Sequence, residues 1–159
     1  MPRRLFLSVV LSLILLPPTI GFASFTGPGV SVFDGDAIEV LHNTRPERIR
    51  LSGIDCLEKG QAYENNAKHV ASALIFGKEV MLQTHGKDKY GRTLGDVFLL
   101  GGTNVSHTLV KDGWCWWYRK YAPRDTELEG LEKEAREAKK GLWADPQPVP
   151  PWEWRKRRD

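Results

Sequence analysis

The sequence predicts a single α+β domain built on a small closed barrel. Strand-like alternation of apolar and polar residues occupies residues 30–54, returns at 79–84 and 93–100, and surrounds a helix pattern at 63–76. Two further helix patterns follow, so the order is strands, helix, strands, helix, helix, which suits a small barrel that carries helices. A chain of 159 residues has room for one core.

The amino terminus has the pattern of a cleavable secretory signal. A short basic stretch precedes an uncharged apolar run from Leu5 to Leu16, which prolines and small residues follow. We expect residues 1–23 to be a signal peptide cleaved after Ala23, and the mature protein to be periplasmic or secreted. A permanent membrane anchor is the alternative, although the run is shorter than the ~20 residues that a spanning helix needs.

The overall charge of the chain points to no particular partner. There are 23 Lys and Arg residues against 20 Asp and Glu, and removal of residues 1–23 takes away two arginines and no acid, so the net charge falls from +3 to +1. Basic clusters at residues 87–92 and 155–158 are more informative, because such clusters attract phosphate backbones. The alternative is a solvated loop and a frayed terminus.

Local signals divide the domain, residues 24–145, from its tail. The strand pattern at 30–42 is interrupted by an Asp34-Gly-Asp36 turn, and the first helix pattern stops at Gly77. We expect Ser106 to cap a short helix that ends at Gly113. Prolines exclude a regular helix after residue 145, so residues 146–159 are expected to form an extended strap with two docked tryptophans and a basic end.

The last helix has the clearest boundaries. Thr126 and Glu129 have the spacing of a capping box, apolar residues form one stripe along the helix, and Gly141 closes it. We therefore expect a helix that begins after Thr126 and continues to Gly141.

Three separated segments carry charges typical of metal-assisted phosphodiester hydrolysis. They are Asp34-Gly-Asp36, the stretch from Arg50 to Glu58, and Asp88-Lys-Tyr-Gly-Arg92. Asp36 and Asp55, with a main-chain carbonyl and water, provide an open oxygen site of the kind that calcium prefers. Each segment alone has a structural explanation as a turn, a solvated strand face or a hairpin connection, and only their combination favours catalysis.

The remaining charged residues fit the chemistry of phosphate. Arg50 and Arg92 offer paired donors to the charge that builds up on phosphoryl oxygens. Glu58 either accepts a proton from the attacking water or holds that water in line, and the sequence leaves both roles open. Tyr90 is a candidate hydrogen-bond donor to phosphate.

The ordered set of these motifs, with Leu109-Val-Lys-Asp-Gly113 after them, closely resembles the staphylococcal nuclease-like family over residues 30–144. The resemblance implies a five-stranded OB-fold barrel with three helices, Ca²⁺ as cofactor, and endonucleolytic hydrolysis of DNA and RNA that leaves 3′-phosphates. By position it implies three calcium ligands, Asp36, Asp55 and the main-chain carbonyl of Cys56. It also implies three catalytic residues, Arg50, Glu58 and Arg92.

The chain departs from the family pattern after the second calcium ligand. Where the founding nuclease has D-T-P-E, this chain has Asp55-Cys-Leu-Glu58, so Leu57 replaces a proline. The segment from Glu58 to Tyr63 is also shorter than the corresponding loop of that enzyme. We therefore expect turnover and substrate preference to differ.

Exposed basic and aromatic residues are the candidates for substrate binding. We expect Lys89, Tyr90 and Tyr121 to bind the nucleic acid, with single strands preferred because an OB-type groove accepts unstacked bases. The inward-facing half of the aromatic run at residues 114–118 is expected to fill the core, and base stacking is the alternative. We expect a monomer with no stable protein partner and no membrane association once the signal is cleaved.

Cys56 and Cys115 are the only cysteines, so the sequence offers neither a cysteine zinc cage nor a disulfide-rich scaffold. Two cysteines of a small exported domain tend to pair, so we expect one disulfide. The resemblance adds that the stretch after Asp55 runs beside the stretch after Gly113. Two reduced, buried thiols are the alternative.

Two other classes of function compete with the enzyme. One is a non-catalytic, nucleic-acid-binding OB-fold module at the cell envelope, and the other is an adaptor held there by an uncleaved leader, with the proline-rich strap as its contact. The presence of all five charged positions favours the enzyme.

Overall fold

The computed structural model describes residues 23–158, so the expected signal peptide lies outside the described residues apart from Ala23. The strands are β1 (Ala23–Val32), β2 (Ala37–His42), β3 (Arg45–Leu51), β4 (Ile54–Cys56), β5 (Glu79–Lys87), β6 (Thr93–Leu99) and β7 (Cys115–Trp117). The helices are α1 (Glu64–Ile75), α2 (Val105–Lys111), α3 (Thr126–Glu137), the 3-10 helix η1 (Gly141–Ala144) and α4 (Pro151–Lys156). No helix within residues 23–158 is long and apolar enough to cross a membrane.

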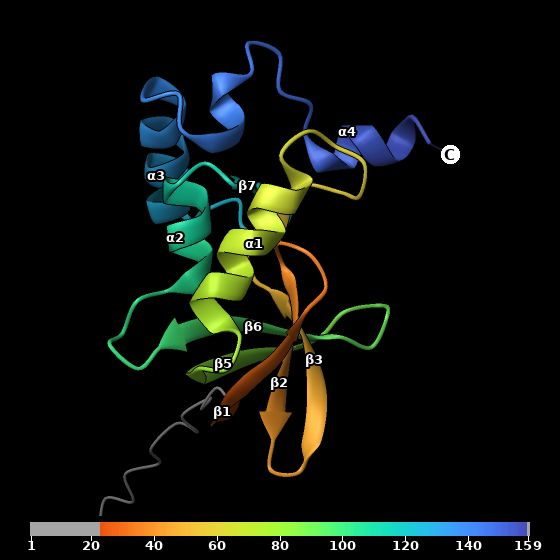
Figure 1. Cartoon of the computed structure of the whole chain (residues 1–159), viewed down its shortest axis with the longest axis vertical. Coiled ribbons are helices and arrows are strands. Elements are labelled where there is room, and N and C mark those ends of the chain that lie inside the picture. Colours follow the sequence, from red (N-terminus) through yellow and green to blue (C-terminus); the bar gives the residue numbers. More distant parts are fainter. Residues whose placement is uncertain (1–22, 159) are drawn as a thin grey trace, which may run out of the picture.

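Five strands close into a barrel in the order β1-β2-β3-β6-β5, which confirms the predicted five-stranded α+β barrel. Neighbouring strands are antiparallel except β3 and β6, which run parallel. Figure 1 shows α1, α2 and α3 at one end of this barrel, while β4 and β7 form a separate two-stranded sheet among them. The end of the barrel that carries the helices is also where the charged segments meet.

The barrel interior is filled by the alternating apolar residues of its strands. In β5, for example, Val80 and Leu82 are fully buried while Met81 between them is exposed, as the two-residue period of a strand requires. The buried core joins residues of the barrel strands to residues of α1 and α2, among them Ile38, Val40, Ile49, Leu51, Ala71, Ile75, Val97 and Leu109. One core therefore supports both the barrel and the helices above it.

The first helix agrees with its prediction, whereas β3 and β4 do not form one strand. Helix α1 ends one residue before Phe76, and Gly77 follows with φ of +71°. The continuous strand expected up to Ile54 is interrupted by Gly53, whose φ of +72° turns the chain between β3 and β4. This turn redirects Asp55 away from the barrel wall and into the second sheet.

The predicted caps of α2 and α3 are wrong by one or two residues. The side chain of Asn104 accepts the His107 N–H at 3.2 Å and caps α2, while Ser106 is buried in the first turn. Asp125 caps α3 by accepting the Leu128 N–H at 2.9 Å. In both cases another residue with a capping side chain lies one or two positions before the one predicted, and its backbone is the one that leaves the helix.

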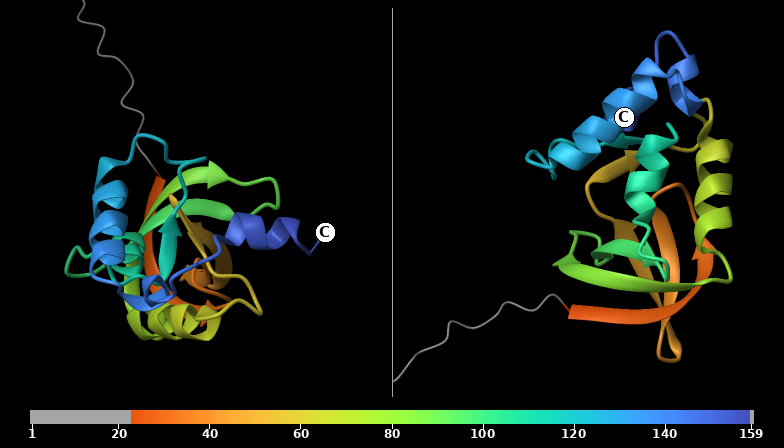
Figure 2. Two further views of the ribbon diagram at one scale, coloured as in Figure 1. Left: turned by 90° about the horizontal axis from the view of Figure 1, so that it is seen from above. Right: turned by 90° about the vertical axis from the view of Figure 1, so that its left-hand side faces the viewer.

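The end of α3 and the tail also differ from expectation. Helix α3 ends at Glu137, and Gly141 begins η1 rather than closing α3. The strap is not extended throughout, because α4 begins at Pro151, a position where proline loses no helical hydrogen bond. Figure 2 shows α4 projecting from the side of the molecule opposite to α3.

Candidate active site

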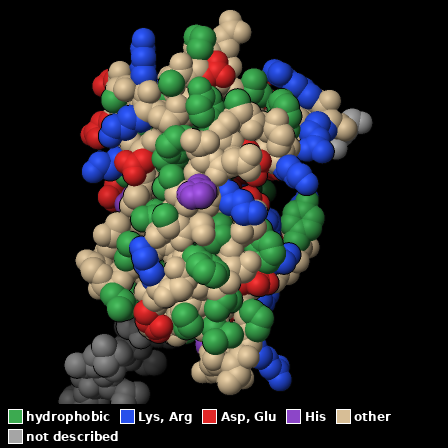
Figure 3. Space-filling model, in the orientation of Figure 1, with side chains coloured by type: hydrophobic (Ala, Val, Ile, Leu, Met, Phe, Trp, Pro, Cys, Tyr) green, Lys and Arg blue, Asp and Glu red, His purple; other side chains and the backbone are tan. Residues whose placement is uncertain are grey.

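An open groove of about 1200 Å³ lies beside β3, β4 and the β5–β6 connection. All the residues predicted from the sequence line it: Asp36, Arg50, Asp55, Cys56, Glu58, Lys89, Tyr90, Arg92 and Tyr121. Figure 3 shows Lys and Arg side chains along the right-hand side of the molecule, from α4 to the β5–β6 connection, with acidic atoms between them. The groove thus combines a basic rim with buried acids.

The Asp34-Gly35-Asp36 turn aims one of its two carboxylates into the protein. Asp34 Oδ1 accepts the N–H groups of Asp36 at 3.0 Å and Ala37 at 2.7 Å, so Asp34 forms the turn itself. Asp36 is only 6% exposed. A Cβ atom on Gly35 would lie 2.6 Å from the Cβ of Cys56, so glycine allows this turn to rest against β4.

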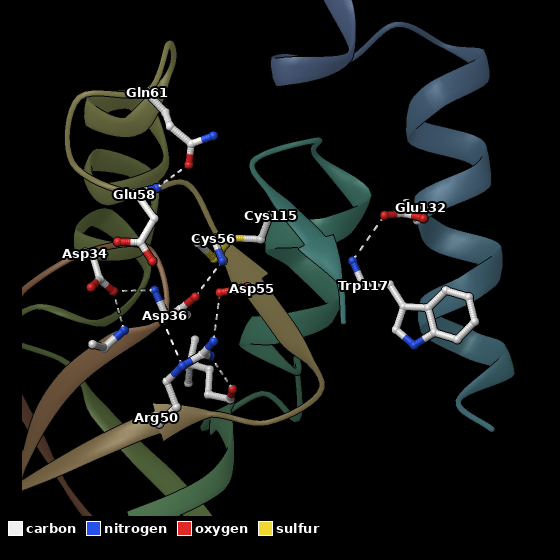
Figure 4. Close-up of a disulfide and its surroundings, with 12 residues drawn as sticks. Asp34, Asp36, Arg50, Asp55, Cys56, Glu58, Gln61, Cys115, Trp117 and Glu132 are labelled. Atoms are coloured by element: carbon white, nitrogen blue, oxygen red, sulfur yellow. Dashed lines mark hydrogen bonds and ion pairs between the residues drawn. A yellow bond between two sulfur atoms is a disulfide. The ribbon is translucent and has the colours of Figure 1, made fainter. Parts of the chain in front are cut away.

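A disulfide between Cys56 and Cys115 joins β4 to β7 and lies next to Asp36. The two Cα atoms are 4.2 Å apart, opposite each other in the two-stranded sheet. The Cys56 N–H donates to Asp36 Oδ2 at 2.5 Å. The bridge therefore fixes the main chain of Cys56 against the acid of the turn (Figure 4).

Arg50 lies between the two buried acids, as Figure 4 shows. Its Nε is 3.2 Å from Asp36 Oδ1, and its Nη2 is 3.1 Å from Asp55 Oδ1. Its Nη1 donates to the Leu51 carbonyl at 2.8 Å, and the side chain is only 13% exposed. The guanidinium is thus held in one orientation by three oxygen atoms.

Burial raises the pKa of Asp36 to about 8. Arg50 and the Cys56 N–H lower this pKa, whereas the nearby charges of Asp34 and Asp55 raise it further. Two carboxylates that are this close and this poorly solvated favour an additional positive charge between them.

Glu58 is oriented by its neighbours rather than by a preceding proline. Leu57 is 4% exposed and packs into a cluster that includes Trp116 and Trp143, which anchors the residue before Glu58. The Glu58 N–H donates to Gln61 Oε1 at 2.7 Å. The substitution of proline by leucine therefore leaves the Glu58 loop fixed by packing and by one side-chain hydrogen bond.

Asp88 holds Arg92 through both of its carboxylate oxygens. Oδ1 accepts the N–H groups of Tyr90 at 2.9 Å and Arg92 at 3.0 Å, and Oδ2 accepts Arg92 Nε at 2.7 Å. Burial acts to raise the pKa of Asp88, but the hydrogen bonds from Arg92 and Tyr90 outweigh it, and the pKa is lowered. Asp88 is thus a positioning group for Arg92, a role that the sequence did not identify.

Residues 48–145 match the family described as "Staphylococcal nuclease homologue". The chain belongs to the staphylococcal nuclease family.

Several relatives of this nuclease are themselves named nucleases or endonucleases, and the similarity extends over most of their length. It is 39% identical over 158 residues to "Micrococcal nuclease" of Shigella flexneri, covering 94% of this chain and 91% of the relative. It is 43% identical over 136 residues to an "Uncharacterized endonuclease" of Escherichia coli, covering 86% of this chain and 88% of the relative. An "Uncharacterized endonuclease" of Haemophilus influenzae is 36% identical over 129 residues, covering 80% and 71%. These similarities place the chain among the endonucleases, a class of hydrolases.

The donor set of the nuclease fits a hard, oxygen-preferring cation. Asp36 and Asp55 are both buried and share Arg50, and the main chain of Cys56 adjoins Asp36. Within residues 23–158 no three His, Cys, Asp or Glu side chains gather into a metal cluster. Two carboxylates, one carbonyl and water molecules would form a coordination shell of oxygen atoms. Calcium accepts such a shell because its coordination geometry is flexible.

The aromatic residues of the nuclease separate into core and rim. Trp116 and Trp117 are buried, which confirms core filling for these two residues, whereas Tyr90 and Tyr121 are 71% and 72% exposed at the groove. The Lys89 Nζ lies 4.9 Å from the centre of the Tyr90 ring. An exposed ring with a basic group over it can contact both a base and a phosphate.

Arg155 lines this groove although the sequence did not predict it there. It lies in the basic tail, and its guanidinium reaches Asp55 and Glu58. The sequence signals were the basic cluster at residues 155–158 and the position of this arginine after two tryptophans in a proline-rich segment. Nothing in that pattern indicates which acids the arginine contacts.

Proposed function

We propose that this chain is an exported, calcium-dependent endonuclease that hydrolyses phosphodiester bonds of DNA and RNA and leaves 3′-phosphates. The observation that supports this function is the meeting of three distant segments at one groove, where Arg50, Glu58 and Arg92 line the same opening as two buried acids that Arg50 bridges. In the proposed reaction, water attacks phosphorus and the bond to the 5′ oxygen breaks, which yields a 3′-phosphate and a 5′-hydroxyl.

The two arginines bind the scissile phosphate. Each is restrained through its Nε by a carboxylate, Arg50 by Asp36 and Arg92 by Asp88. A restrained guanidinium loses little side-chain entropy when it binds phosphate, and its paired donors stabilise the charge that develops in the transition state. Lysine provides the charge but not the paired donors.

Glu58 acts on the attacking water. Its side chain is 35% exposed at the groove, while its main chain is fixed by Gln61. A carboxylate in this position accepts a proton from the water or orients it toward phosphorus. The amide of glutamine cannot accept the proton, and its neutral oxygen is a weaker acceptor for the water than a carboxylate.

Asp36, Asp55 and the carbonyl of Cys56 would hold the calcium ion. When bound, the ion neutralises charge on the phosphoryl oxygens. Burial of the two acids beside each other supports this assignment, because the buried Arg50 supplies one positive charge to two carboxylates. The role of the protein is to keep these oxygens in place, through the Asp34 turn and the disulfide.

The rim of the groove would select single strands. Tyr90 and Tyr121 are exposed rings that can stack on unpaired bases, and Lys89 adds a positive charge. The enzyme is proposed to act as a monomer. The disulfide supports export, because such bridges persist in oxidising compartments such as the periplasm.

The proposal is tested by digestion of denatured DNA with the purified mature protein. We expect cleavage with Ca²⁺, no cleavage with excess chelator, and little with Mg²⁺, which demands a stricter octahedral shell. Products should carry 3′-phosphates, detected by their resistance to extension by a polymerase until a phosphatase is added.

Two results would contradict this function. Binding of DNA without cleavage under any divalent cation would indicate the non-catalytic module instead. Full activity with Mg²⁺ after rigorous removal of calcium would contradict the choice of cation.

A further inference from the structure

The carboxyl-terminal segment is docked against the loop that carries Glu58. Gln61 Nε2 donates to the Val149 carbonyl at 2.9 Å, and the Trp152 ring stacks on Tyr118 with 5.3 Å between centroids. These contacts hold α4 beside β4, although the two elements are about 100 residues apart in the chain. The tail is therefore part of the groove wall rather than a free end.

Arg155 of α4 directs its guanidinium at both acids of this wall. Its Nη2 is 2.7 Å from Asp55 Oδ2, and its Nη1 donates to Asp55 Oδ1 at 3.3 Å. Nη1 also donates to Glu58 Oε1. This fork of donors matches a carboxylate pair in the way that a single point charge cannot.

With Arg155 in place, both oxygens of Asp55 are occupied. Oδ1 accepts from Arg50 and Arg155, and Oδ2 accepts from Arg155. A divalent cation bound by Asp55 needs some of these lone pairs, and its charge repels a guanidinium that is within hydrogen-bond distance of them. Three of the four lone pairs of the Asp55 carboxylate are thus taken, so binding of the cation favours withdrawal of one of the two arginines.

Arg155 is the arginine that is free to withdraw. Arg50 is 13% exposed and is held by three oxygens, one of them on Asp36. Arg155 is 41% exposed and is carried by a helix of six residues near the end of the described chain. Rotation of its long side chain breaks no contact of the core.

We propose that Arg155 is a resident counter-cation of the active site, which neutralises Asp55 and Glu58 until a divalent cation displaces it. This inference rests on the proposed calcium site at Asp36 and Asp55. Because the two cations compete for one carboxylate, binding of either weakens binding of the other by the same factor. Arg155 thus sets the calcium concentration at which the enzyme becomes active. At lower concentrations its positive charge compensates the negative charges of Asp55 and Glu58.

The test is isothermal titration of the purified, oxidised protein with Ca²⁺ alone, without nucleic acid. Arg155→Ala should bind Ca²⁺ roughly 5- to 150-fold more tightly than the wild type, the range typical of coupled sites. Arg157→Ala is the matched control, because it removes the same charge from an exposed residue two positions further on and should change the affinity less than about twofold. Arg155→Lys, which keeps the charge and loses the fork, should fall between the wild type and Arg155→Ala, and melting curves check that each variant is folded.

The outcomes separate this inference from the proposed function. If Asp55→Asn abolishes Ca²⁺ binding but Arg155→Ala binds no more tightly than Arg157→Ala, the calcium site stands and the competition is refuted. If neither the wild type nor Arg155→Ala binds Ca²⁺, both are refuted. A crystal structure with calcium gives an independent check, since an Arg155 Nη2 that remained at 2.7 Å from Asp55 Oδ2 would also overturn the inference.

Discussion

Reduction of the Cys56–Cys115 bridge should destabilise the protein and weaken cation binding at the proposed site. The bridge closes a loop with a sequence separation of 59 residues. By limiting the entropy of the unfolded chain, a bridge across a loop of this length adds about 4 kcal/mol to the free energy of unfolding. This is an upper value that any native strain lowers. For a domain of this size the loss corresponds to a fall of roughly 10–20 °C in Tm.

The assay compares calorimetric melting of the oxidised and the reduced protein in the presence of chelator. Reduction keeps both buried sulfur atoms, so it isolates the covalent link from the packing that alanine substitution would also remove. Thiol titration of the unfolded protein before and after reduction gives the number of free thiols. We also expect weaker Ca²⁺ binding after reduction, because the Cys56 N–H that donates to Asp36 lies on the bridged strand.

Two results would refute this reasoning. Two free thiols in the unreduced protein would show that the bridge is absent. A Tm that changed by less than about 2 °C after complete reduction would show that loop closure contributes little to the stability of this fold.

Three further predictions concern the rim and the core. Single-stranded DNA should be cut faster than a duplex of the same sequence in a gel assay, and equal rates would argue against a groove that selects unpaired bases. Tyr90→Ala and Tyr121→Ala should each weaken single-strand binding by roughly 1–3 kcal/mol in fluorescence anisotropy without lowering Tm, and unchanged affinity would show that the rings do not stack. Burial raises the pKa of Glu132 despite its pairing with Arg136, so the folded state holds this proton more tightly than the unfolded state. That contribution to stability is present at low pH and is lost as pH rises through the folded pKa, so Glu132→Gln should gain stability relative to the wild type as pH rises. Urea denaturation at several pH values measures this difference, and a difference independent of pH would contradict the assignment.

Features set by local chemistry were predictable from the sequence. Helix α1 has an apolar face and a glycine at its end, and it was predicted to within one residue. The strands of the barrel follow their alternation. The Asp34–Asp36 and Asp88–Arg92 motifs lie on turns between strands, and Arg50 lies near the end of β3. These motifs meet because the ends of neighbouring strands in a closed barrel share one edge.

Features set by tertiary contacts were not predictable in the same way. Asn104 and Asp125 cap their helices in preference to Ser106 and Thr126, and the choice depends on where the backbone leaves the helix. The helical form of the tail and the contacts of Arg155 depend on Trp152 docking against a ring that is distant in the chain. Proline content alone indicated an extended strap, since it does not show that Pro151 occupies the first helical position.

The most direct test of the account is the turnover of Arg50→Lys, Arg92→Lys and Glu58→Gln on single-stranded DNA with saturating Ca²⁺. Each change removes stabilisation needed mainly in the transition state, so each should lower kcat by roughly two to four orders of magnitude while Tm stays near that of the wild type. Arg45→Lys, an exposed position on the same strand as Arg50, serves as the control and should retain wild-type turnover. Near-normal kcat for any of the three variants would contradict the role given to that residue, and near-normal kcat for all three would contradict catalysis at this groove.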